Sequence, residues 1–308
     1  MSRFTRSWTE SDERARRILL FAAVCALGTM LFALGSAIAE ADSFRNASGQ
    51  VEKASYLNGG THSAPSVQSS GAISNVVYFP IIGKAPPACP MPGGSYGTVA
   101  VIPYVARTTP AEDDPDVNLA LRSYTPTVAY QGLVDLGGPP SDPSAPQLYN
   151  LFTDKRVPVF SGVYQVYDWD WSCNCRGAPI TDYPVTLAGF DMSPGEQVCA
   201  PGSGYDIGYA PVGYAMMVLY ADTSRITLKY TREDSVVNGY TVHIENIDVD
   251  PNLLALYQSM NSAGRVRLPA LFAGQAIGSA ITTELGVAIR DTGAFLDPRS
   301  RQDWWQGK

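Results

Sequence analysis

The sequence has 308 residues, with 22 basic and 29 acidic side chains and a net charge of -7. A hydrophobic content of 45% excludes a wholly disordered chain, and the acidic balance argues against nucleic acid as a partner, because phosphate binding needs clustered Lys and Arg. The 28 Gly and 23 Pro, with only 17% charged residues, indicate a loop-rich, mainly β protein. Having two histidines, the chain cannot build a three-histidine zinc site.

Residues 1–39 are predicted to be a signal peptide or a membrane anchor. Arg16 and Arg17 precede an uncharged, apolar run over residues 18–39, which ends in the small-residue sequence Ala-Ile-Ala before Glu40. A cleaved signal and an uncleaved anchor both fit this pattern, and the two alternatives stay open. Either one places the rest of the chain outside the cytoplasm, and only this segment is expected to contact a membrane.

The next two segments carry few signals of regular structure. Residues 40–74 are rich in Ser, Gly, Asn and Ala, which predicts a flexible linker. Residues 75–170 are predicted to form a loop-rich β extension, with a strand near 98–106 and turn-forming stretches such as Gly-Gly-Pro-Pro at 137–140. Much of this extension is expected to lie over the domain that follows.

Residues 171–308 are predicted to form the main β domain. Runs rich in Val, Ile, Leu and Tyr predict its strands, at 215–221, 225–231, 240–247 and 285–290. One helix is predicted at 251–263, because Asp250 is a suitable N-cap, Pro251 suits the first turn and Gly264 suits the end.

The cysteines predict disulfide bonds. If Cys25 leaves with a signal peptide, four remain: Cys89, Cys173, Cys175 and Cys199. An even count in an exported chain is typical of disulfide bonding. One residue separates Cys173 from Cys175, a spacing that we consider too tight for an internal bridge, so each is expected to pair with one of the other two. Zinc binding is the alternative, but C-x-C is not the usual C-x-x-C spacing of a zinc knuckle.

The densest aromatic and acidic cluster is Asp168-Trp169-Asp170-Trp171. Strand alternation would place both tryptophans on one face and both aspartates on the other. Exposed tryptophans at these positions would stack on sugar rings. Tryptophans packed in the core beside solvated carboxylates are the more common arrangement.

No catalytic set is evident from the residues alone. His243 has Glu245 two positions away on the same strand face, but a lone histidine there is more typical of a surface hydrogen-bonding group than of a catalyst. Asp248 and Asp250 lack the glycine and the distal Glu of a calcium-binding hand. The Gly-Ser-Gly at 202–204 is not the G-x-S-x-G of a nucleophile elbow.

Several short motifs follow one another between residues 183 and 298. They are LAGFD at 187–191, PGEQVCAP at 194–201, MVLY at 217–220, TLKYTR at 227–232, AGQAIG at 273–278, and ELGVAIR at 284–290 with DP at 297–298. In this order they resemble the lysostaphin-type zinc endopeptidases, which cut the cross-bridges of peptidoglycan. The resemblance implies a barrel-sandwich hybrid-like β domain, in which residues 234–269, with the helix, are an insertion.

The zinc ligands of that family do not carry over. The histidine of its first motif, H-x-G-I-D, falls on Leu187, and only the aspartate, Asp191, is kept. The H-x-H pair falls on Glu284 and Gly286, and the histidine that ends the second strand falls on Arg232. A zinc hydrolase needs about three protein ligands. We therefore expect no metal, no cofactor and no hydrolysis by the family's mechanism.

The resemblance instead implies a degenerate pocket formed by Asp191, Arg232 and Glu284. A planar guanidinium can bridge two carboxylates through paired hydrogen bonds. We hypothesise that Arg232 replaces the metal electrostatically; the alternative is that Arg232 points to solvent at a strand end.

The preferred function is a non-catalytic, exported module at the cell surface, which binds peptidoglycan, another cell-wall polymer or a partner. Two alternatives stay open. One is an active zinc metallopeptidase with a different ligand set that includes His243. The other is a carbohydrate-binding β module that uses Trp169 and Trp171.

Overall fold

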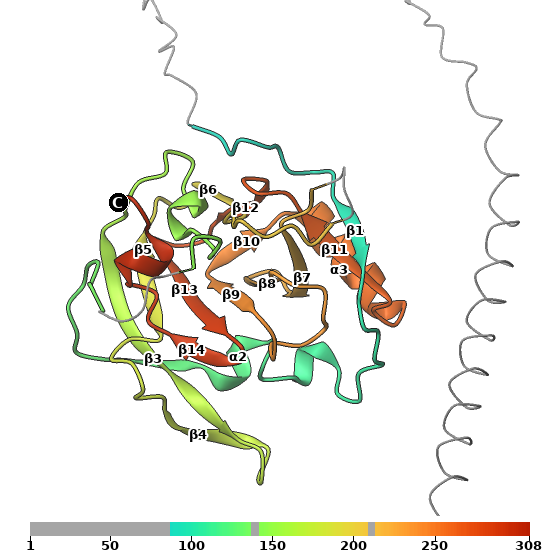
Figure 1. The fold of residues 1–308 in the computed structure, drawn as a ribbon, viewed down its shortest axis with the longest axis horizontal. Helices are drawn as coiled ribbons and strands as arrows, with labels where there is room; N and C mark the ends of the chain where they lie inside the picture. The colour runs from blue at the N-terminus through green and yellow to red at the C-terminus, as the bar shows by residue number, and fades with distance from the viewer. Residues whose placement is uncertain (1–86, 137–141, 209–212) are drawn as a thin grey trace, which may run out of the picture. The chain divides into compact units, whose positions relative to one another are not determined.

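The computed structural model describes residues 87–136, 142–208 and 213–308 (Figure 1). The predicted signal or anchor segment and the predicted linker, residues 1–74, lie outside these ranges, as does Cys25. None of the helices in the described residues is long and apolar enough to span a membrane.

Eleven strands of the described residues form one antiparallel sheet, which confirms the mainly β prediction. In spatial order they are β1 (Gly97–Ala100), β11 (Arg267–Leu271), β7 (Met216–Ala221), β8 (Arg225–Lys229), β9 (Tyr240–Glu245), β13 (Glu284–Asp291), β5 (Leu187–Asp191), β3 (Phe160–Asp170) and β2 (Tyr124–Pro126), with β14 (Ala294–Leu296) beside β13 and β4 (Cys175–Pro179) beside β3 (Figure 1). The path is open at both ends, so these strands do not close into a barrel.

A three-stranded sheet makes the fold sandwich-like. Its strands are β10 (Ile247–Val249), β12 (Ala276–Ala280) and β6 (Gln197–Cys199). Val198, Val249 and Ile277 of this sheet share a core with the apolar side chains of the large sheet. The described helices are α3 (Pro251–Ser262) and the short η1 (Ala111–Asp113), α2 (Leu119–Arg122), η2 (Leu148–Leu151) and α4 (Arg301–Trp304).

The predicted helix is confirmed as α3. The Oδ1 atom of Asp250 accepts hydrogen bonds from the backbone N–H groups of Asn252 (2.9 Å) and Leu253 (3.4 Å), which caps the first turn. Gly264 follows the helix with a φ of 85°, a conformation that glycine adopts without the steric cost of a Cβ. Leu253 and Tyr257 bury one side of the helix against the core.

One face of the large sheet forms the main hydrophobic core. Leu285, Val287 and Ile289 of β13 point into it together with Val242 and Ile244 of β9, and all five are fully buried. Their alternate neighbours lie on the other face, since side chains of a strand alternate between its two faces. Several of those neighbours are polar and still buried, namely His243, Glu245 and Arg290, as is Thr227 of the adjacent β8.

Residues 107–126, which we call the strap, cover this polar face. The hydroxyl of Thr227 donates to the carbonyl oxygen of Val117 at 2.6 Å, and Arg290 donates to Asp116. Leu119 of α2 packs in a small second core, with Val166, Leu187, Ala288 and Phe295. The polar face is therefore an interior surface, because a segment from the N-terminal half of the chain seals it.

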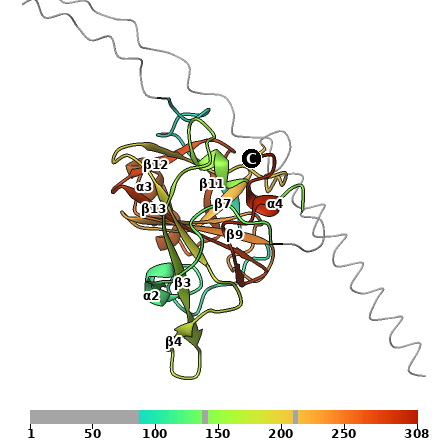
Figure 2. The ribbon, with the colours of Figure 1, turned by 90° about the vertical axis from the view of Figure 1, so that its left-hand side faces the viewer.

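Strands from both sides of residue 170 share the large sheet. β1, β2 and β3 come from the predicted extension, and the remaining strands come from the predicted main domain. The expected boundary falls at the turn of the hairpin formed by β3 and β4, whose register pairs Asp170 with Cys175. In both views this hairpin extends beyond the neighbouring elements (Figures 1 and 2).

Candidate functional site

Asp191 and Glu284, two of the three residues of the predicted pocket, lie side by side. They are direct partners in the register of β5 and β13. The carboxylate of Glu284 accepts hydrogen bonds from the hydroxyl groups of Ser161 (2.6 Å) and Tyr164 (2.8 Å), both on β3. Strands β13, β5 and β3 thus hold the carboxylate of Glu284 in a fixed orientation, and the exposed carboxylate of Asp191 lies beside it.

Two glycines leave room for glutamate side chains on this part of the sheet. A Cβ atom at Gly189 would lie 2.3 Å from Oε2 of Glu284, so only glycine lets this carboxylate lie flat on β5. At Gly286 a Cβ would lie 3.2 Å from Cβ of Glu245, its partner in the register of β9 and β13. A side chain at the H-x-H position that the family resemblance assigns to Gly286 would therefore crowd Glu245.

Arg232 does not join the two carboxylates, which corrects the predicted three-residue pocket. Arg225, at the start of β8, pairs with Glu245 of β9, which in turn pairs with Gly286 of β13. From Arg225 onward, β8 leads away from the end of the sheet that contains Glu284. Arg232 follows the far end of β8, where its Nε donates to the carbonyl oxygen of Ala100 at 2.9 Å. The hypothesis that Arg232 replaces a metal between Asp191 and Glu284 is wrong for this reason.

The side chains at this place do not fit the zinc that the family resemblance implies. Leu187 is fully buried and has no donor atom, and Gly286 has no side chain. Asp191 and Glu284 supply carboxylate oxygens, but a zinc hydrolase needs about three protein ligands. Within the described ranges, no group of three or more His, Cys, Asp or Glu side chains could hold a metal ion.

Glu245 is the most unusual acid of the polar face. Burial raises its pKa to about 7, although Arg225 opposes this shift from 3.1 Å. Asp222 binds the same guanidinium at 2.7 Å. Tyr124 of the strap also has a raised pKa, because it is half-buried and lies near the negative charges of Glu245 and Glu284. Glu245 can exchange a proton near neutral pH, but it lies under the strap, where only 5% of its surface is exposed.

His243 is fully buried, so the prediction of a surface histidine is wrong. Its Nδ1 lies 3.0 Å from the hydroxyl of Thr227, and its ring stacks on Phe295 with centroids 6.0 Å apart. Burial, together with the positive charges of Arg290 and Arg122, holds its pKa well below the usual value. His243 is therefore a neutral interior residue, and it stands apart from the carboxylates of Asp191 and Glu284.

The ion cluster beneath the strap was missed by the sequence analysis. Oδ1 of Asp116 binds Nη2 of Arg122 at 2.8 Å and Nη2 of Arg290 at 3.1 Å. The sequence Asp-Pro-Asp ends at Asp116, but by itself such a sequence predicts only a turn. Its partner Arg290 belongs to a strand far along the chain, and no local pattern shows such a contact.

The tryptophans of the predicted aromatic cluster lie at the hairpin of β3 and β4. Trp171 follows the end of β3 and is 62% exposed, so it is not a core residue. Trp169 is half-buried, and its Nε1 donates to Oδ1 of Asn174 at 3.2 Å. At the base of the hairpin lies a pocket of about 350 Å³, whose lining includes Asp168, Ile180 and Phe295.

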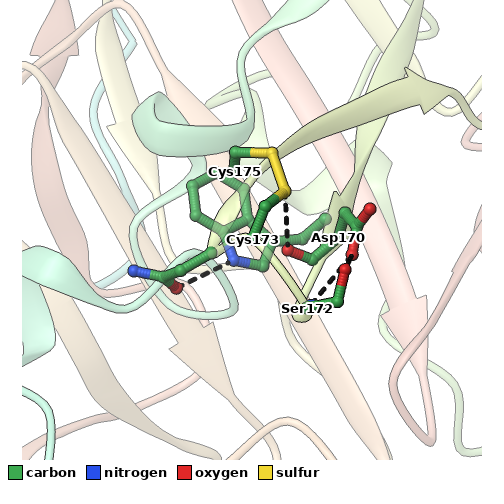
Figure 3. The surroundings of a disulfide bond; sticks show 6 residues. Asp170, Ser172, Cys173 and Cys175 are labelled. Carbon is green, nitrogen blue, oxygen red and sulfur yellow. Dashed lines mark hydrogen bonds between the residues drawn. A yellow bond between two sulfur atoms is a disulfide. The ribbon is translucent and has the colours of Figure 1, made fainter.

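The turn of this hairpin is held by several local interactions (Figure 3). Oδ1 of Asp170 accepts from the hydroxyl (2.6 Å) and the backbone N–H (2.9 Å) of Ser172, and these hydrogen bonds lower the pKa of Asp170. Asn174 has a φ of 51°, a left-handed conformation that asparagine tolerates better than most residues. These contacts lie within the turn itself and use no residue of the main core.

The two disulfides pair differently from the expectation. Cys89 binds Cys199, and Cys173 binds Cys175 across a single residue. The predicted pairing of Cys173 and Cys175 with the other two cysteines is wrong, because the turn brings their Cα atoms within 5.3 Å of each other. The linear spacing did not reveal this, since it depends on the left-handed conformation of Asn174.

Comparison with known proteins gives little further guidance. No protein-family model matches this chain, and no curated protein matches it. A zinc-containing peptidase from Vibrio cholerae is similar in structure, with a TM-score of 0.26 and 11% sequence identity. The match covers 55% of this chain and only 40% of that chain. Such a likeness is at most to a distant peptidase-like fold, and it assigns neither an activity nor site residues to this chain.

Proposed function

We propose that this protein is a non-catalytic module that works outside the cytoplasm and binds a cell-wall polymer through the hairpin of β3 and β4. The observation that carries the proposal is the tip of this hairpin, which is fixed in conformation although it covers no core. Trp171 at the tip is 62% exposed, which leaves a large aromatic surface in water.

A fixed tip has a physical advantage for binding. The Cys173–Cys175 disulfide and the hydrogen bonds of Asp170 and Asn174 restrict the turn before any ligand arrives. A surface that is already ordered loses less conformational entropy on binding, so more of the contact energy contributes to affinity. These bonds order the turn locally and bury no apolar surface, so they contribute little to the main core.

The composition of the hairpin suits a hydroxyl-rich polymer. The aromatic rings of Trp171 and Trp169 offer flat apolar faces, and the guanidinium of Arg176 lies 5.4 Å from the ring centre of Tyr167 on the adjacent strand. The pocket at the base of the hairpin combines charged and apolar lining, including Asp168. Binding sites for small ligands and polymer units commonly combine apolar walls with a few placed polar groups.

The non-catalytic part of the proposal rests on the residues of the polar face. Among the residues that the structure describes, Asp191 and Glu284 have no third ligand group beside them, and His243 is buried and neutral beneath the strap. Glu245 titrates near neutral pH but is covered by the same segment. These groups do not form a site where a metal, a base and a substrate could meet.

Pull-down of the purified protein on insoluble peptidoglycan, with chitin and cellulose in parallel, tests the proposal. The wild type is expected to be retained by peptidoglycan, and Trp171→Ala is expected to lose most of this retention. Tyr130→Ala is the matched control, because Tyr130 is 69% exposed but lies outside the hairpin. Retention that is equal for wild type and Trp171→Ala would contradict the role of the hairpin, and retention by chitin or cellulose alone would reassign the polymer.

A further inference from the structure

The disulfide at the hairpin tip is open to reagents in solution. Cys173 and Cys175 are both exposed, and so are Ser172 and Asn174 of the same turn. The other disulfide is different, because Cys199 is fully buried and Cys89 is 8% exposed. Thiol–disulfide exchange requires a thiolate to reach a sulfur atom, so access alone favours reaction at the tip.

We expect the hairpin to stay intact when this disulfide is opened. The register of β3 and β4 already pairs Asp170 with Cys175, and the hydrogen bonds between Asp170 and Ser172 need no sulfur atom. The stabilisation by a disulfide grows with the length of the loop that it closes, and this loop contains one residue. The native fold therefore has little to lose when the Cys173–Cys175 bond is reduced.

A hydrogen-bond acceptor lies close to one of the two sulfur atoms. Sγ of Cys173 lies 3.6 Å from the carbonyl oxygen of Asp170 (Figure 3). A disulfide sulfur has no proton to donate, so in the oxidised protein this approach is only a contact. The thiol formed on reduction can donate its proton to that oxygen. We expect one backbone conformation of the turn to serve both redox states, with the two sulfur atoms moving apart by side-chain rotation on reduction.

From these three observations we infer that the Cys173–Cys175 disulfide is a thiol–disulfide exchange site, whose substrates are flexible polypeptide segments that carry two thiols. A flexible segment suits the site, because the sulfur atoms lie at a narrow turn and a folded surface would have to present its thiols on a protrusion. The inference does not depend on polymer binding, since exchange with a peptide in solution involves no polymer.

The reaction transfers two electrons from the substrate to the hairpin. A substrate thiolate attacks one sulfur, so that a substrate–protein disulfide forms and the Cys173–Cys175 bond breaks, with the other cysteine leaving as a thiolate. The second substrate thiol, as its thiolate, then displaces the protein sulfur. The products are a substrate disulfide and two protein thiols, and the two protons of the substrate thiols end on the two cysteines. A small-molecule disulfide such as oxidised glutathione restores the starting bond.

Selective reduction is the first test, on the full chain with Cys25→Ser in every sample. The folded protein is incubated with reduced glutathione, quenched by alkylation and mapped by mass spectrometry. The Cys173–Cys175 bond is expected to be reduced at least about tenfold faster than the Cys89–Cys199 bond, which must first become exposed. The alkylated fraction of each cysteine pair over time measures the two rates. Equal rates for the two pairs would overturn the inference.

Substrate oxidation is the second test. The oxidised protein is mixed with a flexible peptide that carries two cysteines, and is expected to yield up to one equivalent of peptide disulfide, with further turnover when oxidised glutathione is present. The Cys173→Ser/Cys175→Ser variant keeps the buried disulfide and is expected to show only the rate without protein. Its unfolding midpoint, measured in parallel, establishes that the variant is folded. Equal peptide oxidation by this variant and the wild type would overturn the inference, whatever the outcome of the polymer pull-down.

Discussion

Of the two disulfides in the described residues, Cys89–Cys199 is buried and joins residues 110 positions apart, whereas Cys173–Cys175 is exposed and joins residues two positions apart. The first attaches the start of the described chain to β6, where the backbone N–H of Cys89 also donates to Gln197 at 2.7 Å. The second lies in a turn that its own hydrogen bonds already define. The buried disulfide therefore stabilises the fold, whereas the exposed disulfide shapes a local surface.

The largest expected effect separates these two roles directly. Cys89→Ala/Cys199→Ala is expected to lower the free energy of unfolding by about 4 kcal/mol, because the bond closes a long loop in the unfolded chain. Cys173→Ser/Cys175→Ser is expected to cost less than about 2 kcal/mol, since its loop is minimal. Urea denaturation of both variants measures the difference. Losses of equal size would show that the two bonds do not differ in the way described.

A second prediction asks whether the strap belongs to the buried, cooperative part of the molecule. Asp116→Ala removes the carboxylate that binds Arg290 and Arg122, and both guanidinium groups are buried. Because Asp116 itself is partly exposed, the expected loss is about 2–3 kcal/mol, below that of a wholly buried pair. Asp154→Ala is the matched control, since it removes an exposed pair with Arg156 and is expected to cost less than about 1 kcal/mol. A neutral Asp116→Ala in thermal or urea unfolding would mean that the strap is only loosely attached.

The pH dependence of stability gives a third prediction. The pKa of Glu245 is raised to about 7 in the folded protein, so the folded state holds this proton more tightly than the unfolded chain. The resulting stabilisation is complete below the unfolded pKa and disappears as the pH rises to about 7. The unfolding free energy of wild type minus that of Glu245→Gln is expected to fall by about 2–3 kcal/mol from pH 4 to pH 8. A difference that does not change across this range would show that Glu245 titrates normally.

The smallest expected effect is at the hairpin tip. Trp171→Ala is expected to change the free energy of unfolding by less than about 0.5 kcal/mol, because the side chain is mostly in water already. Trp305→Ala is the matched contrast, with an expected loss of about 3–5 kcal/mol from a fully buried position. If Trp171→Ala destabilised the fold as strongly as Trp305→Ala, the tip would be part of the core rather than a separate surface.

Local patterns in the sequence were sufficient for the features that depend on near neighbours. The cap at Asp250 and the stop at Gly264 predicted α3, because capping and left-handed conformations are decided within a few residues. The strand that contains Val242 and Ile244 was recognised in the same way, from its alternating apolar residues.

The features that the sequence did not reveal depend on distant contacts. His243 and Glu245 alternate like the solvent face of a strand, and only the strap makes that face an interior one. The order of motifs predicted Arg232 close to Asp191 and Glu284, whereas the direction of β8 carries it to the other end of the sheet. For the candidate site, the pairing of Asp191 with Glu284 was the part that could be anticipated, because both lie on strands that the motif order brings together.

The order of strands along the chain has a consequence for when the protein can fold. β1 is made early but pairs with β11, where Gly97 lies opposite Ala270. The strap likewise binds residues of β8 and β13, such as Thr227 and Arg290. During synthesis, β1 and the strap therefore wait for partners from the C-terminal half of the chain, and the large sheet is completed only when β13 and β14 have left the ribosome. Folding of this domain is therefore completed only after the strands of its C-terminal half have been synthesised.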